Sequence, residues 1–179
     1  MKSVLEIRTY DPAWVDEFEH ERTRLWAVLG ALALRIEHNG STSVPGLAAK
    51  SVIDIQISVQ QMHPLDRYVQ LLARAGYVHV PHDDDAFAPF FHRPEAWPHT
   101  HHVHVVAAGG DEERKTLAFR DYLREHPQVA REYESLKKSL AQCYSAAECS
   151  TRQAYAEAKG EFIVRVTNQA LAEGYPRNL

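Results

Sequence analysis

The segment of residues 37–57, EHNGSTSVPGLAAKSVIDIQI, constrains the fold more than any other part of the chain, because small and polar residues lie there between two apolar stretches. Its residues 40–43, Gly-Ser-Thr-Ser, predict a turn rich in backbone N–H groups and hydroxyls. Residues 52–59 have the apolar character of a buried strand, and that strand carries a single acid, Asp54. A donor-rich turn that faces a strand carboxylate suits a phosphate group and a divalent metal ion.

Hydrophobic periodicity on either side of this segment alternates between the helical and the strand repeat, which is typical of an α/β (α+β) fold. The predicted strands cover residues 31–37, 52–59, 77–80, 87–93 and 100–107, and the predicted helices cover residues 14–29 and 64–75. The last third is helical almost throughout, with a break at Pro127 and a final helix over residues 150–171. We expect a mixed β-sheet with helices packed on one side and a helical C-terminal part.

Composition limits the function classes that the chain can serve. With 179 residues, of which 45% are hydrophobic, the chain is expected to form one domain over residues 1–179. Its net charge of −4 and its pI near 6.2 argue against a broad nucleic-acid-binding surface, although local positive charge still allows a small acidic ligand. No signal peptide or apolar run of membrane-spanning length is present, so we expect a soluble, cytoplasmic protein without a membrane partner.

Histidine is the unusual residue type, with 11 in the chain and four of them between His99 and His104. The alternating strand over residues 100–107 places His102 and His104 on the same face. Two imidazoles at this spacing can bind one divalent ion, such as zinc, nickel or manganese, if a neighbouring strand supplies the carboxylate of Asp54. Alternatively, both rings fill a half-buried polar face and bond to backbone or water. A role as a general base is a third option.

Two cations and one hydroxyl near these motifs also have more than one reading. Lys50 and Arg93 are each a candidate anion-binding group, and each could equally be a solvated surface residue. Ser41, combined with the histidines, raises the option of a Ser-His-Asp hydrolase. That option fails because no G-x-S-x-G elbow is present and Ser41 lies between two predicted strands.

The Gly-Ser turn and the acid strand that follows it resemble the signature of the nucleotidyltransferase superfamily. In that superfamily the turn holds the nucleotide triphosphate, and strand carboxylates hold two magnesium ions. This chain departs from the pattern, because Gln56 stands where a second acid would share the face of Asp54. An ordinary strand-turn-strand is the alternative explanation of the motif.

A wider set of residues resembles the GrpB family, whose members are similar to nucleotidyltransferases in topology. The matching segments, in the family's order, are Tyr10-Asp11-Pro12-Ala13-Trp14 with Phe18, His38 with residues 40–47, Ala49-Lys50, Ile53-Asp54-Ile55, residues 101–106, residues 119–124 with His126-Pro127, and Tyr155 with residues 157–160. The resemblance covers nearly the whole chain. It departs from the family at Asn39, where an aliphatic residue is usual, and at Ser51, where proline is usual.

The resemblance implies a nucleotidyltransferase-like fold with the histidine strand beside the Asp54 strand, and it implies no assigned reaction. We expect a cleft that also contains His38, with Lys159 as an outer residue. The candidate catalytic and metal-binding residues, for magnesium, manganese or zinc, are Asp54, His102 and His104. The candidate residues for holding a nucleotide or another small phosphorylated ligand are Gly40, Ser41, Thr42, Lys50 and Arg93.

Three hypotheses for function follow from these residues. The first is metal-dependent transfer of a nucleotidyl or phosphoryl group, with Asp54 and the histidines at the metal. The second is a binding module that kept the pocket without the reaction, which the amide at Gln56 favours. The third is a protein-interaction module that uses the helical C-terminal third.

Overall fold

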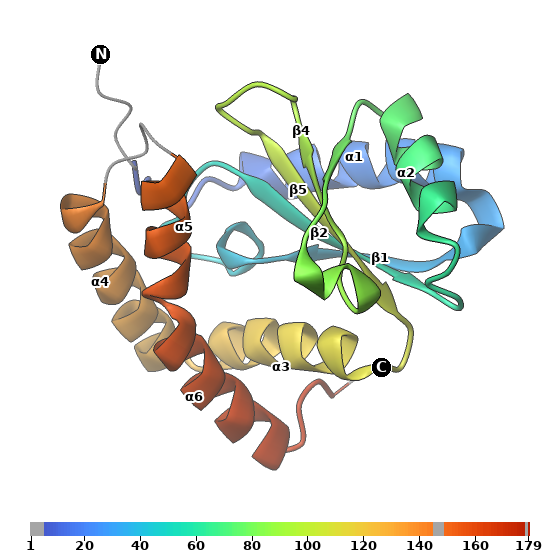
Figure 1. The fold of residues 1–179 in the computed structure, drawn as a ribbon. Coiled ribbons are helices and arrows are strands. Elements are labelled where there is room, and N and C mark those ends of the chain that lie inside the picture. The colour runs from blue at the N-terminus through green and yellow to red at the C-terminus, as the bar shows by residue number, and fades with distance from the viewer. Residues whose placement is uncertain (1–5, 145–148, 178) are drawn as a thin grey trace.

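A five-stranded mixed β-sheet forms the centre of the molecule in the computed structural model, which describes residues 6–144, 149–177 and 179 (Figure 1). The strands are β1 (Ala33–Asn39), β2 (Ile53–Val59), β3 (Val78–Val80), β4 (Phe90–Arg93) and β5 (His101–Ala107). Their order in the sheet is β1-β2-β5-β4-β3, and only the central pair β2 and β5 is parallel. The predicted mixed sheet is thus confirmed.

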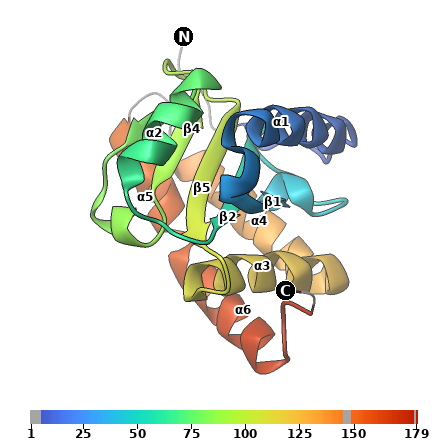
Figure 2. The ribbon, with the colours of Figure 1, turned by 90° about the vertical axis from the view of Figure 1, so that its right-hand side faces the viewer.

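Helices cover both faces of this sheet rather than one side, as Figures 1 and 2 show. Helices α1 (Ala13–Leu29) and α2 (Leu65–Arg74) pack on one face. The opposite side carries the helical C-terminal part, which consists of α3 (Asp111–Glu125), α4 (Pro127–Cys143), α5 (Cys149–Glu157) and α6 (Gly160–Ala172). Among the described residues, no helix combines the length and apolar character that crossing a membrane requires.

The face beneath α1 is the apolar one. Trp14, Phe18, Leu25 and Leu29 recur at helical spacing on α1 and are all buried. They join a core made from the odd-numbered residues of β2, which include Ile55 and are themselves buried. Because each such side chain contributes about 1.5–3 kcal/mol when buried, this face anchors the sheet and leaves the even-numbered residues of β2 on the opposite face.

The C-terminal helices form a second core of their own. Tyr122 and Leu123 of α3 pack with Val166 and Ala170 of α6. The final helix that the sequence predicts over residues 150–171 is two helices in the structure, because α5 ends at Glu157 and α6 begins at Gly160. The two residues between these helices, Ala158 and Lys159, therefore lie at a junction rather than inside a continuous helix.

Smaller differences from the predicted elements occur where short 3-10 turns form. Residues 30–32 make such a turn, so β1 begins two residues later than expected and continues to Asn39. Another turn occupies Asp83–Ala86, between the strands predicted over residues 77–80 and 87–93, and β4 begins only at Phe90.

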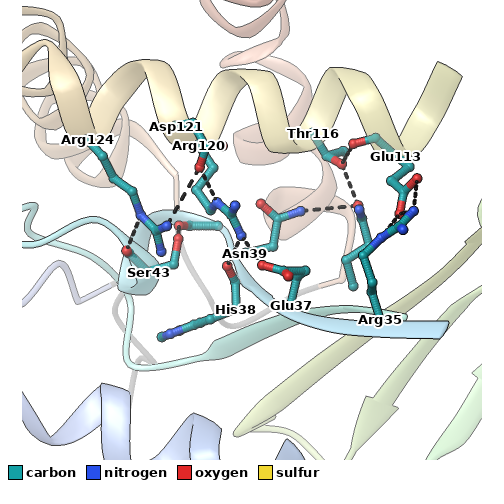
Figure 3. A network of polar contacts seen from close by, with 12 residues as sticks. Arg35, Glu37, His38, Asn39, Ser43, Glu113, Thr116, Arg120, Asp121 and Arg124 are labelled. Carbon is teal, nitrogen blue, oxygen red and sulfur yellow. Dashed lines mark hydrogen bonds and ion pairs between the residues drawn. The ribbon is translucent and has the colours of Figure 1, made fainter. Parts of the chain in front are cut away.

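Ion pairs hold α3 against the edge strand β1 (Figure 3). Arg35 of β1 forms a bidentate pair with Glu113, whose carboxylate oxygens lie 2.6 and 2.7 Å from Nη2. Two turns further along α3, Arg120 Nη1 donates to Glu37 Oε2 at 2.7 Å. Both pairs join α3 to the same strand, so they set the position of the C-terminal helices relative to the sheet.

Candidate functional site

The parallel pairing of β2 and β5 brings the two sequence motifs together. Asp54 lies level with His102, and Gln56 lies level with His104. On the other side of β2, Asn39 is the partner of Asp54. The sequence-based hypothesis that the acid strand and the histidine strand are neighbours is therefore confirmed.

A cavity of about 900 Å³ lies between this polar sheet face and the C-terminal helices. Phe90 lines it from β4, Phe119 from α3 and Ile163 from α6. The cavity also contains most of the residues that the sequence singled out, namely Gly40, Ser41, Thr42, Lys50, Asp54, His102 and His104.

The turn after β1 brings its backbone very close to the strand acid. Gly40 has φ 64° and ψ −170°, a conformation that is essentially restricted to glycine. A Cβ atom at this position would lie 2.8 Å from Asp54 Cβ and closer still to the carboxylate. Ser43 closes the turn by donating from Oγ to the Gly40 carbonyl at 2.6 Å. Arg124 of α3 supports the turn from outside, with Nε 3.0 Å from the Ser43 carbonyl (Figure 3).

His38 does not line the cavity, which corrects the expectation for this residue. Its ring lies on the apolar side of the sheet and stacks on Phe18 with centroids 4.7 Å apart. From there Nε2 bonds to Thr42 Oγ1 at 2.9 Å. Burial lowers the pKa of His38 to about 4, despite the opposing influence of the Asp54 charge. His38 is therefore a neutral ring that supports the turn from behind.

Asp54 is the acid that faces the cavity, and its side chain keeps 38% of its exposure. His102 Nδ1 lies 3.3 Å from Asp54 Oδ1, and His102 Nε2 lies 3.3 Å from His99 Nδ1. Burial pushes the pKa of Asp54 upward, but the hydrogen bond and charge of His102 and the charge of Lys50 outweigh it, so the pKa is lowered overall. Asp54 is accordingly a carboxylate at neutral pH.

Besides Lys115, three lysines reach the same cavity from different parts of the chain: Lys50, Lys137 and Lys159. The Nζ atoms of Lys50 and Lys159 lie 5.2 and 4.6 Å from the ring centroid of Tyr155. Lys137 Nζ lies 4.8 Å from the ring of Tyr133 and donates to the Ala48 carbonyl at 2.5 Å. None of the ion pairs found between described residues includes any of the three lysines.

Burial and mutual repulsion make these ammonium groups unusually acidic. Burial, followed by the charge of Lys159, lowers the pKa of Lys137 to about 7. Burial, followed by the charge of Lys50, lowers the pKa of Lys159 to about 8. Asp54 opposes both shifts but does not cancel them. The cavity is thus a cationic site, because the acidic groups of the protein do not neutralise all of its lysines. This holds although the chain as a whole has a net charge of −4.

Arg93 is the one predicted phosphate-binding residue that the structure does not bring to the cavity. It pairs with His101 across β4 and β5, so both side chains lie on the apolar face of the sheet. Its Nη2 lies 3.1 Å from Glu21 Oε2 and 3.1 Å from His101 Nδ1. The ion pair with Glu21, a residue that is 3% exposed, gives Arg93 a role in the core instead.

Comparison with known proteins places this arrangement in a family. The sequence profile described as GrpB protein matches residues 4–169. The chain belongs to the GrpB family. A crystal structure of conserved protein GrpB from Enterococcus faecalis is 35% identical, with a TM-score of 0.82 over 94% of this chain and 98% of that chain. UPF0157 protein YqkA of Bacillus subtilis (strain 168) is 37% identical over 140 residues, and the match spans 78% of this chain but only 40% of YqkA.

The GrpB fold also has a more distant structural neighbour. The structure of a GLD-2/RNP-8 complex matches with a TM-score of 0.52 at 15% identity, over 73% of this chain and 54% of that chain. GLD-2 has the nucleotidyltransferase fold, so the expectation of a nucleotidyltransferase-like architecture is confirmed. At this identity the likeness concerns the fold alone.

Two-magnesium chemistry, which this fold would suggest, does not suit the donor atoms of this GrpB cavity. Among the described residues, no group of three His, Cys, Asp or Glu side chains is arranged to hold a metal ion. Gln56, the substitute for a second acid, is 1% exposed and accepts a hydrogen bond from Thr116. Of the two carboxylates that line the cavity, Glu112 is paired with Lys115, so Asp54 alone is left among the other lysines. One such carboxylate is a poor ligand set for two hard cations.

Sequence reasoning missed Lys137 as a site residue and treated Lys159 as peripheral. A signal was present, because both lysines follow a tyrosine by four residues on a helical segment, in Tyr133-x-x-x-Lys137 and Tyr155-x-x-x-Lys159. Residues at this spacing are neighbours on a helix surface, so the ammonium group can lie over the ring. The pattern could indicate a repeated Tyr–Lys unit, although it could not show that both units face one cavity.

Proposed function

We propose that the cavity binds a small phosphorylated ligand of nucleotide size. The observation that carries this proposal is a set of three cavity lysines that form no ion pair with the described residues, Lys50, Lys137 and Lys159. The cavity has two carboxylates, Asp54 and Glu112, and Glu112 is paired with Lys115. Buried ammonium groups without acidic partners are costly, and a bound polyanion would stabilise them. Phosphate oxygens are the matching acceptors.

Other groups in the cavity support a ligand with more than a phosphate. The turn at Gly40 offers backbone N–H groups, which suit phosphate oxygens. The hydroxyl of Tyr155 is buried and has no hydrogen-bond partner among the described residues. Apolar side chains such as Phe90 and Phe119 supply contact for a base or another carbon skeleton, and 900 Å³ lies within the range of small-molecule sites.

A transfer reaction is the second candidate, and the close pair of Asp54 and His102 is the observation that favours it. In such a reaction this pair would orient a hydroxyl and accept its proton. The buried amide of Gln56 favours binding without transfer, because it removes the second carboxylate of two-metal chemistry. Binding is therefore the primary proposal.

Isothermal titration with ATP, ADP, inorganic phosphate and adenosine tests the binding proposal. We expect the phosphorylated compounds to bind and adenosine to bind far more weakly. Replacing Lys50 by Gln is expected to weaken ATP binding roughly 10- to 100-fold, the value of one lost charged contact of about 1.5–3 kcal/mol. Lys115→Gln is the matched control, because Lys115 lines the same cavity but is half-exposed and paired with Glu112 at 2.8 Å.

Equal ATP affinities for the wild type and Lys50→Gln, or heats no larger for ATP than for adenosine, would overturn the binding proposal. Turnover is measured separately, by incubation with labelled nucleoside triphosphates and candidate acceptors in magnesium, manganese or zinc. Pyrophosphate release that Asp54→Asn abolishes would support transfer. Saturable binding without release would leave the binding module as the function.

A further inference from the structure

One lysine of the cavity, Lys159, has surroundings that phosphate binding alone does not require. Lys159 lies at the junction between α5 and α6, lines the cavity, and contacts the face of Tyr155 rather than a carboxylate. Lys50 lies over the same ring, so two ammonium groups share one buried tyrosine that is 1% exposed. Desolvation and a neighbouring cation both favour the neutral amine over the ammonium ion.

We propose that Lys159 is a nucleophilic amine, which forms an imine with the carbonyl group of a phosphorylated aldehyde or ketone bound in this cavity. The proposal rests on the phosphate-binding function above, because Lys50 and the Gly40 turn would hold the phosphate while Lys159 meets the carbonyl carbon. Lysines that are desolvated or placed beside another cation are the ones that perform this chemistry in proteins.

The step balances without an oxidant or a reductant. The lone pair of Lys159 Nζ forms a bond to the carbonyl carbon, and the carbonyl oxygen takes a proton as the nitrogen loses one. The resulting carbinolamine then loses its hydroxyl group together with a second nitrogen proton as water, and the imine remains. His102 lines the same cavity, close to Asp54, and is placed to exchange protons in the dehydration step.

The protonation state of Lys159 agrees with this role. With a pKa of about 8, about a tenth of the side chain is neutral at pH 7. For a lysine with an ordinary pKa the neutral fraction is only roughly one part in 2,500. Lys115 provides a contrast in the same cavity, because its hydrogen bond to Glu112 and the charge of that residue raise its pKa.

The test uses pyridoxal phosphate as a phosphorylated aldehyde probe, with pyridoxal as the probe that lacks phosphate. The full chain is incubated with limiting probe, reduced with borohydride to trap the imine, and mapped by peptide mass spectrometry. We expect the adduct at Lys159, at least about tenfold above any other lysine. Lys137 is included in that comparison, because its Nζ is held by the Ala48 carbonyl while Lys159 Nζ lies over the Tyr155 ring. ATP should compete with the probe. The rate of adduct formation should rise with pH, reach half of its plateau near pH 8, where half of the amine is neutral, and level off at higher pH.

Lys159→Arg removes the nucleophile and keeps the positive charge, so the trapped adduct should be lost. Lys115→Arg should keep the adduct at Lys159, and Lys159→Gln gives a second loss variant if the arginine disturbs packing. An adduct spread over surface lysines, or one unchanged in Lys159→Arg, would overturn the inference. Reversible binding of pyridoxal phosphate with no trapped adduct would overturn the inference and leave the binding proposal intact. Equal labelling of Lys159 by pyridoxal, which lacks the phosphate group, would contradict the role of phosphate in both the binding proposal and this inference.

Discussion

The position of Gly40 restricts the residue type more strongly than any other position in this site. Its positive φ and its approach to Asp54 act together, because the backbone conformation that aims the turn at the carboxylate also removes the space for a side chain. At Gly40 the cavity wall itself would have to move.

Gly40→Ala is therefore expected to destabilise the protein and to displace Asp54. The backbone strain alone should cost on the order of 1–3 kcal/mol, and the clash adds to it. Gly46→Ala is the matched control, because Gly46 also has a positive φ, of 80°, but open space around its Cα. Urea unfolding and ATP titration of both variants check the prediction. Equal losses in the two variants would contradict the role assigned to the close approach.

His38 makes a prediction about pH at the same scale. Its folded-state pKa of about 4 lies below the unfolded value of about 6.5, so the unfolded chain binds more protons at this residue between these values. Stability should fall as the pH decreases from about 6.5 to about 4, by at most about 3 kcal/mol from this residue, and the loss should then level off.

Urea unfolding at about pH 7 and about pH 4.5 measures this effect. His38→Gln should show a smaller decrease between the two pH values than the wild type, because the ionisable ring is gone. His20→Gln, which changes an exposed residue of α1, should keep the decrease of the wild type. An unchanged decrease in His38→Gln would show that His38 is not the source.

At the scale of elements, α3 is the part that holds the two halves of the cavity together. It contacts β1 through Arg35–Glu113 and Arg120–Glu37, and it supports the Gly40 turn through Arg124. Arg120 is 8% exposed and also donates to the His38 carbonyl at 3.1 Å. A single helix thus sets the edge strand and the turn that follows it.

Arg120→Ala is expected to reduce the free energy of unfolding by about 1–3 kcal/mol, because it leaves the Glu37 carboxylate and a buried carbonyl without their donor. Lys115→Ala, on the same helix, breaks only an exposed pair and should change stability by about 0.5 kcal/mol or less. Denaturant unfolding of the two variants provides the comparison. A loss of unfolding free energy in Arg120→Ala as small as that in Lys115→Ala would contradict the role of Arg120 in holding α3 against β1.

The elements that the sequence predicts well are those with a strong period. The α1 face of Trp14 and Phe18 and the alternation of β5 both survive in the structure, because a buried stripe determines them locally. The break before Gly160 was not predictable in the same way. A glycine costs only about 1 kcal/mol inside a helix, so tertiary packing decides whether the helix continues.

The candidate site was predictable where residues lie near one another in sequence or in neighbouring strands. The turn and Asp54 share one segment, and the parallel register then brings His102 beside them. Arg93 was expected at the cavity, but its side chain lies on the other face of the sheet. Neighbouring residues of a strand point to opposite faces, so an error of one residue in the register moves a side chain from one face to the other. Lys137 could not be assigned, because nothing in its local pattern shows which helix packs over the sheet.

At the scale of the whole molecule, the cavity lies between two layers that contribute different charged groups. The sheet layer contributes the carboxylate of Asp54 and the imidazole of His102, and the helical layer contributes the ammonium groups of Lys137 and Lys159. A ligand that bridges them would therefore bind the two cores to each other. This gives ligand binding a direct route to increase stability.

The order of these layers along the chain has a consequence for synthesis. Chains emerge from the ribosome N-terminus first, so the sheet, which is complete at Ala107, can assemble before Lys137 and Lys159 have emerged. A nascent chain at that stage would hold Asp54 and its turn but lack the ammonium groups that are proposed to capture phosphate. The protein would thus acquire its ligand only after α6 has emerged and covers the sheet.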